Sequence, residues 1–138
     1  MSFDQTLTTS FKQEILLGVH DLDTDTLKMA LYLGTANLGA ATTVYTTTSE
    51  TTGAGYTAGG NTLTGVTVLT SGTTAYVDFA NSSWNPASFT ARGALIYNAS
   101  KGNKAIAVLD FGADKTTTTT FTVQMPANTA TNALIRIS

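Results

Sequence analysis

Short runs of alternating apolar and polar residues recur along most of the chain, and turn-forming residues separate them. In residues 27–33, LKMALYL, the odd positions are apolar. A period of two is that of a β-strand with one face turned toward a core. Comparable runs follow at 62–70, 75–79, 88–98, 105–111, 121–125 and 133–137. About seven short strands of this kind predict an all-β fold, an antiparallel β-sandwich that is jelly-roll-like or a partly closed barrel.

These runs predict one hairpin and one central strand. The turn at 71–72 is only a few residues from the run at 75–79, so 62–70 and 75–79 are predicted to pair as a hairpin. The inward face of its second arm would carry Ala75, Val77 and Phe79. Residues 105–111 are almost continuously apolar, which predicts a central strand buried on both faces. One face of the preceding strand would carry Phe89, Ala91, Gly93, Leu95 and Tyr97.

The first twenty residues follow a different pattern. Ser10 and Gln13 have capping-box spacing and Gly18 is a typical C-terminal stop, so a short amphipathic helix is predicted over residues 10–17. Its apolar face would carry Phe11, Ile15 and Leu16. Residues 1–9 contain few apolar side chains and are predicted to form an extended arm. The chain therefore divides into an arm and helix at 1–20 and a β-sandwich domain at 21–138.

Glycine and polar residues mark the predicted loops. Residues 35–60 are expected to be irregular, with one helical turn opening at 48–50. Within them the stretch 53–60, GAGYTAGG, lacks the Lys-Ser/Thr pair that ends a phosphate-binding loop, so it is interpreted as structural. Residues 81–87, NSSWNPA, are predicted to form a polar loop around Trp84.

Two segments near the end of the chain are also turn-like or repetitive. Residues 112–115, GADK, are predicted to be a turn. The threonine run at 116–120 is predicted to be a strand start or a hairpin arm, because threonine favours strands.

The composition excludes several classes of function. The chain has no cysteine, which removes disulfides, thiolate metal sites and cysteine nucleophiles. Its seven basic residues are scattered and the net charge is −2, so nucleic acid is not expected as a partner. No segment reaches transmembrane length and no secretory signal begins the chain, which predicts a protein made in the cytoplasm without membrane contact. Threonine fills about a fifth of the chain where charge is scarce, and such a neutral surface suits packing against other subunits.

The acidic run beside the single histidine is the one candidate cation site. His20 precedes Asp21, Asp23 and Asp25 at alternate positions. An EF-hand loop starting at Asp21 would need glycine at its sixth position and glutamate at its twelfth, where this chain has threonine and tyrosine. A cation loop of another kind and a solvated turn with capping aspartates both stay open. No metal or cofactor is assigned to it.

The other carboxylates do not predict catalysis. Asp78 and Asp110 lie in predicted strands and could be neighbours across a sheet, as paired glycosidase acids are across a cleft. A structural ion pair between Asp110 and Arg92 is the favoured interpretation. Because no nucleophile motif accompanies His20, the chain is not expected to be an enzyme.

Aromatic side chains on predicted loops offer a second kind of binding site. They could form a sugar-binding platform or anchor an interface. Partial burial in the core explains them equally well. The residues concerned are Trp84, Tyr32, Tyr45, Tyr56 and Tyr76.

Several stretches together resemble small virion proteins of tailed bacteriophages, and the resemblance spans nearly the whole chain. They are SFKQEILLGVHDLDTDTLKMALYL, VYTTTSETTGAGYTAGGNTL, TARGALIYNAS, KAIAVLDFGADKTTTTTFTVQMP and the closing ALIRI. The resemblance implies a capsid cement, or decoration, protein on the outside of the phage head. Its partners would be the major capsid protein, other virion subunits and copies of itself, most simply as a trimer. A tail, neck or fibre component that binds host glycans is the alternative.

Overall fold

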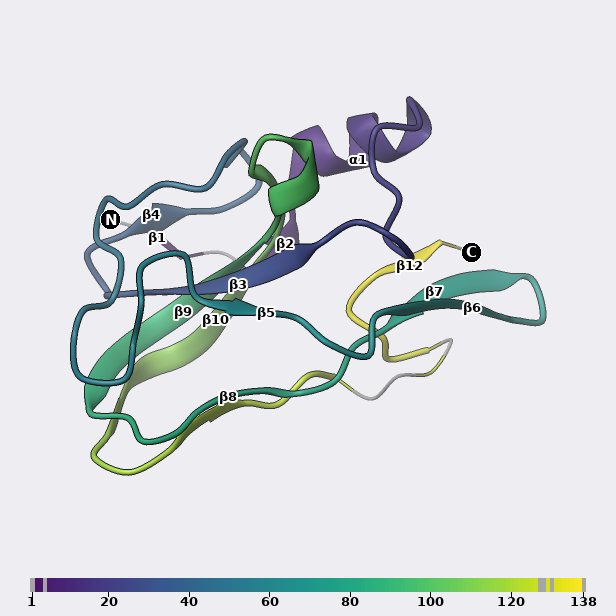
Figure 1. Cartoon of the computed structure of the whole chain (residues 1–138). Coiled ribbons are helices and arrows are strands. Elements are labelled where there is room, and N and C mark those ends of the chain that lie inside the picture. Colours follow the sequence, from purple (N-terminus) through teal and green to yellow (C-terminus); the bar gives the residue numbers. More distant parts are fainter. Residues whose placement is uncertain (1, 4, 127–128, 130, 138) are drawn as a thin grey trace.

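The computed structural model describes residues 2–3, 5–126, 129 and 131–137 (Figure 1). The fold is all-β and sandwich-like with one short helix, as the sequence predicted. Its central layer is a five-stranded antiparallel sheet in the order β2-β10-β9-β3-β5. These strands are β2 (Thr6–Leu7), β10 (Lys104–Thr117), β9 (Phe89–Asn98), β3 (Leu27–Tyr32) and β5 (Asn61–Thr62).

Two smaller antiparallel sheets pack against one face of this layer. One has the order β12-β7-β6, from β12 (Arg136–Ile137), β7 (Thr74–Asp78) and β6 (Thr67–Ser71). The other pairs β11 (Phe121–Val123) with β8 (Ser82–Trp84). A continuous apolar cluster joins them to the central sheet, and it includes Met29, Val77, Trp84, Ile106 and Phe121. Burial of this cluster is the main source of stability in a chain without disulfides.

The opposite face of the central sheet is covered as well. Leu38 and Tyr45, from the segment between β3 and β5, pack there against Tyr32 and Val108. A two-stranded parallel pair, β1 (Ser2–Phe3) and β4 (Asn37–Leu38), lies on this side. β3 is therefore buried on both faces, although its alternating sequence predicted one buried face. The prediction of a central strand at 105–111 is confirmed for residues 105–109, whereas Phe111 is half-buried.

A bulge replaces the turn predicted at 112–115. Asp110 pairs with Gly93 and Lys115 pairs with Ala91, so residues 111–114 all lie opposite Arg92. Gly112 supplies the positive φ, +82°, that this detour requires. Where β9 passes this bulge, the side chains that it turns toward the main apolar cluster change from odd to even positions. The prediction that Phe89 to Tyr97 share one face is therefore wrong, because Leu95 and Tyr97 lie on the face opposite to Phe89 and Ala91.

The helix α1 (Thr9–Leu16) matches the predicted element but is capped differently. Its N-cap is Thr8 and not Ser10, since the Thr8 hydroxyl accepts from the Phe11 N–H at 3.1 Å. Gly18 ends the helix in the left-handed region, as predicted. Phe11 is buried, but Leu16 is 85% exposed, so the predicted apolar face was one residue too wide. In the segment predicted as an arm, residues 2–3 and 6–7 form β1 and β2, and β2 pairs with β10 at the edge of the central sheet, whereas Thr9 already belongs to α1. Residues 1 and 4 of the predicted arm lie outside the described residues.

Three further predictions concern the loops, and only one of them is confirmed. The polar loop predicted at 81–87 is wrong, because β8 occupies 82–84 and Trp84 is buried in the main cluster. Residues 48–49 form a turn without helix, and Ser49 has φ 60°. The 53–60 stretch is a loop, as predicted. At Gly60 an added Cβ would lie 1.7 Å from the carbonyl oxygen of Met29, so the glycine is needed for close packing on β3.

The predicted hairpin is confirmed in its two arms. β6 and β7 pair in continuous register from Thr67↔Asp78 to Ser71↔Thr74. The run predicted as one strand at 62–70 is divided, because β5 ends at 62 and β6 begins at 67. The closing strand is shorter than predicted, since only 136–137 form β12, although Ala133 and Ile135 are buried.

Candidate functional site: an apolar groove beside the helix

A hollow of about 730 Å³ lies between α1 and the β12-β7-β6 sheet. Figure 1 shows these elements side by side, with the C-terminal strand between the helix and the hairpin. The walls are mostly aliphatic and aromatic. They include Phe11, Ile15 and Leu16 from the helix and Val68, Tyr76, Val77 and Ile137 from the strands. Ligands and partner proteins commonly bind in concave apolar surfaces of this kind.

Exposed apolar side chains gather at this groove. Within the described residues, large apolar side chains with high exposure are Leu16, Leu17, Val44, Val68, Leu69 and Ile137. Of these six, Leu16, Val68 and Ile137 line the groove, whereas Leu17, Leu69 and Val44 do not. Patches of exposed apolar surface mark interaction sites more often than isolated residues do.

The charge around the groove is low. Lys12, Asp21 and Arg136 are the charged residues that line it, and the hairpin carries no charge before Asp78, the last residue of β7. A neutral apolar surface costs little to remove from water, because few charged groups must lose their hydration. The groove is therefore suited to another protein surface of apolar character.

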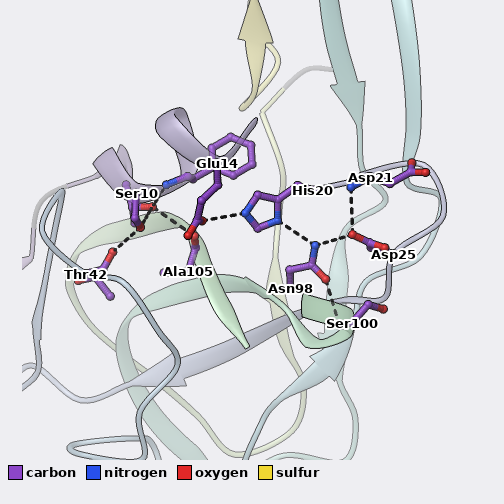
Figure 2. A network of polar contacts seen from close by, with 11 residues as sticks. Ser10, Glu14, His20, Asp21, Asp25, Thr42, Asn98, Ser100 and Ala105 are labelled. Atoms are coloured by element: carbon purple, nitrogen blue, oxygen red, sulfur yellow. Dashed lines mark hydrogen bonds and ion pairs between the residues drawn. The ribbon is translucent and has the colours of Figure 1, made fainter. Parts of the chain in front are cut away.

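A polar network surrounds His20, one of the residues that line the groove (Figure 2). His20 Nε2 lies 3.0 Å from Glu14 Oε1 of α1, and its Nδ1 lies 2.9 Å from the Asn98 amide nitrogen. The Asn98 oxygen accepts from the Ser100 N–H, which fixes the amide with its nitrogen toward the histidine. His20 Nδ1 therefore accepts, and Nε2–H donates to Glu14. His20, which precedes the acidic run considered as a cation site, ties the helix to the end of β9.

The acidic run next to it forms a capped turn. Asp25 accepts from the Asn98 amide at 2.8 Å, from the Asp21 N–H at 3.0 Å and from Lys101 Nζ at 3.2 Å. Burial raises the pKa of Asp25, but these hydrogen bonds and the lysine charge outweigh burial, so its pKa lies below the usual range. Asp21 accepts from the Asp23 N–H, as a capping aspartate does. Among the described residues no cluster of three or more His, Asp and Glu side chains is placed to hold a metal ion.

The other predicted carboxylate interaction is present. Arg92 Nε lies 3.3 Å from Asp110 Oδ1, beside the β10 bulge. Asp78 is in β7, in a different sheet from Asp110, so the two acids are not neighbours across one sheet. Both members of the Arg92–Asp110 pair are part-exposed, and such a pair contributes little to stability.

Most of the aromatic residues considered as a sugar-binding platform pack in or against the core. Trp84 is 4% exposed and packs edge-on against Phe89 and Phe121. Tyr32 is fully buried, and Tyr45 stacks on Tyr97 at 4.6 Å. Tyr76 alone lines the groove. This placement counts against a sugar platform made by the predicted aromatic set.

Sequence reasoning missed one buried acid. Glu50 is 7% exposed and accepts from the Tyr45 hydroxyl at 2.6 Å, from the Tyr56 hydroxyl, and from the Gly59 N–H at 2.8 Å. Burial and the hydrogen bond to Glu50 both raise the pKa of Tyr45 and of Tyr56. This cluster fastens the 45–60 loop over the central sheet. The only signal in the sequence was a lone acid in a long uncharged loop.

Membrane insertion by a helix has no support in the described part of the chain, where no helix is both long and apolar enough to span a bilayer. Comparison of the chain with protein-family models, with curated protein sequences and with solved structures gave no match. The function is therefore argued from the surface that the residues themselves build.

Proposed function

We propose that this chain is a structural subunit of a tailed-phage particle, and most simply a cement protein that binds across capsid subunits on the outside of the head. The observation that carries the proposal is the apolar groove beside α1, with Leu16, Val68 and Ile137 exposed along it. The low charge of the surrounding surface and the resemblance of the sequence to small virion proteins support the same proposal.

The physical mechanism is stabilisation by mass action. A subunit that binds the assembled lattice and not the separated capsomers lowers the free energy of the assembled state. The groove would take an apolar segment of the capsid surface, and the buried core beneath would hold the groove in shape. No bond is made or broken, so no catalytic group is required.

Particles with and without the protein test the proposal. Heads that carry it are expected to resist heating and dilution of divalent cations better than heads that lack it. Equal resistance of the two would overturn the cement function. A cryo-EM map of the complete particle would also show whether the chain is on the head or in the tail, neck or fibre.

A matched pair of variants tests the groove itself. Leu16→Asp places a charge in the groove at a side chain that is 85% exposed, so the fold is expected to stay intact. Its binding to heads that lack the protein should weaken roughly tenfold or more, as at a central interface residue. Val44→Asp makes the same change on an exposed apolar side chain away from the groove and should bind normally. The reverse result would place the contact on the Val44 side.

A homotrimer is part of the proposal, because a three-fold subunit can bridge several capsomers at once. Native mass spectrometry of the purified chain measures the number of copies. The glycan-binding alternative would need aromatic side chains on an exposed rim, and the burial of Trp84 and Tyr32 counts against those two residues in that role.

A further inference from the structure

The strand β6 is an exposed edge. It is the outer strand of the β12-β7-β6 sheet, and all five of its residues are exposed. Figure 1 shows the β6–β7 hairpin projecting beyond the central sheet. A strand with one free edge presents unpaired backbone N–H and C=O groups to any extended chain that can reach it.

The register identifies which backbone groups are free. Val77 donates its N–H to Ile135 O at 3.1 Å, which means that this N–H points away from β6. Val77 and Val68 are therefore a non-hydrogen-bonded pair of the antiparallel ladder. The N–H and C=O of Val68 then point off the sheet edge. Thr70, two residues further along the strand, has the same orientation.

Nothing in the sequence of this edge blocks pairing. Natural edge strands are commonly protected by proline, by charged side chains or by a bulge. β6 reads Thr-Val-Leu-Thr-Ser, has no charge and no proline, and pairs with β7 without a register shift. The chain carries no Asp, Glu, Lys or Arg from 51 to 77.

We propose that β6 pairs with β6 of a second copy of this chain, antiparallel and about a two-fold axis at Leu69. In that register Val68 lies opposite Thr70 of the second copy, and both use their outward-pointing N–H and C=O groups. Leu69 lies opposite its own counterpart at a non-hydrogen-bonded position, where cross-strand side chains are closest. The two three-stranded sheets become one continuous sheet.

A second copy fits this edge better than a different protein does. The edge is neutral, so two copies meet without like-charge repulsion, and it offers no charge by which a charged partner would be selected. The sequence is also self-complementary about Leu69, since Thr67 lies opposite Ser71 of the second copy and hydroxyl pairs are favourable across strands. A two-fold contact uses the same patch on both copies and closes without further growth.

The inference rests on the geometry of β6 and not on the proposed function. Five residues from each copy form a small interface, so the pairing is expected to depend on concentration. Held side by side on any assembled surface, two copies would pair more readily because their local concentration is high.

Sedimentation and native mass spectrometry of the purified full chain over a concentration series test the pairing. The mass is expected to double, or to become that of a hexamer if the pairing joins two trimers. Thr70→Pro removes an outward N–H from each copy without removing a bond to β7, and should raise the dissociation constant roughly tenfold or more. Leu69→Lys should do the same through charge repulsion, with Val44→Lys as the unaffected control. Circular dichroism checks that each variant is folded.

A cross-link places the axis directly. The natural chain has no cysteine, so Leu69→Cys introduces a single thiol. At a two-fold cross-strand position the two Cβ atoms are close enough for a disulfide, and mild oxidation should link the two copies. Val44→Cys should stay unlinked. A monomer at every concentration, or an oligomer unaffected by both β6 variants and not linked by Leu69→Cys, would overturn the pairing while leaving the test on phage heads unchanged.

Discussion

Similar residue types are buried in the central strands β3, β9 and β10 and exposed in the outer strand β6 of the β6–β7 hairpin. Leu31 of β3 is fully buried, whereas Leu69 of β6 is 37% exposed, and each is a leucine in an antiparallel strand. In the central sheet both faces are covered and both neighbouring strands are present. In the hairpin the outer strand β6 is exposed along its whole length and has one open edge, while β7 is half-buried.

The polar groups follow the same division. His20, Glu50 and Asn98 are buried in the body, and every buried side-chain polar atom among the described residues has a hydrogen-bond partner there. The hairpin instead leaves the backbone groups of Val68 and Thr70 directed off the sheet edge. The open strand edge and the groove lined by exposed apolar side chains are therefore the places where the proposed contacts are located.

The largest expected effect comes from the same substitution made in both regions. Leu31→Ala leaves a cavity in the main cluster and should lower the free energy of unfolding by about 2–5 kcal/mol. Leu69→Ala removes a side chain that packs little within one copy, so its effect should stay within about 0.5 kcal/mol. Urea unfolding of dilute protein measures both. Similar losses for the two leucines would show that the hairpin is part of the core after all.

A second test concerns the buried acid. The Glu50 carboxylate accepts three hydrogen bonds through its two oxygens. Glu50→Gln replaces one of these oxygens with an amide nitrogen, which cannot accept a hydrogen bond, so the free energy of unfolding should fall by about 1–3 kcal/mol. The matched change Asp23→Asn lies on an exposed turn and should be nearly neutral. Thermal unfolding of the two variants makes the comparison. An unchanged transition for Glu50→Gln would mean that the 45–60 loop is held by its apolar contacts alone.

Sequence reasoning succeeded where local pattern decides the structure. The position of the strand β3, the apolar run at 105–109, the β6–β7 hairpin and the glycine stop at Gly18 all depend on neighbouring residues, and all are present. It failed where a distant contact decides the structure. The residues around Trp84 predict a polar loop, but in the structure β8 pairs with β11 and the Trp84 ring is buried in the core.

The bulge and the groove show the same limit at two scales. Residues 112–115 have turn composition, but the partner strand β9 keeps them in the ladder as a bulge. The groove joins Leu16 of the helix to Ile137 at the other end of the sequence, so no local pattern could reveal it. Composition predicted packing against other subunits, and this stays a prediction.

Alkaline pH should weaken the body through its tyrosines. The pKa of Tyr45 and of Tyr56 is raised in the folded chain by burial and by Glu50, so both phenols stay protonated after their unfolded counterparts ionise near pH 10. Their contribution is complete below pH 10 and is lost as the pH rises above it. Tyr45→Phe should flatten this loss in a pH series of urea titrations.

Acid should act on the body more weakly, through Asp25, and should not act on the hairpin contact. The folded pKa of Asp25 is lowered, so its stabilising contribution is present above the unfolded value of 3.8 and is lost as the pH falls through the folded value. Asp25→Asn should therefore reduce the slope of stability against pH below about 4. Because β6 contains no ionisable side chain, the dissociation constant of the proposed pair should be the same at pH 5 and pH 8. A marked change between these pH values would mean that a titratable group, and hence a region outside β6, takes part in the contact.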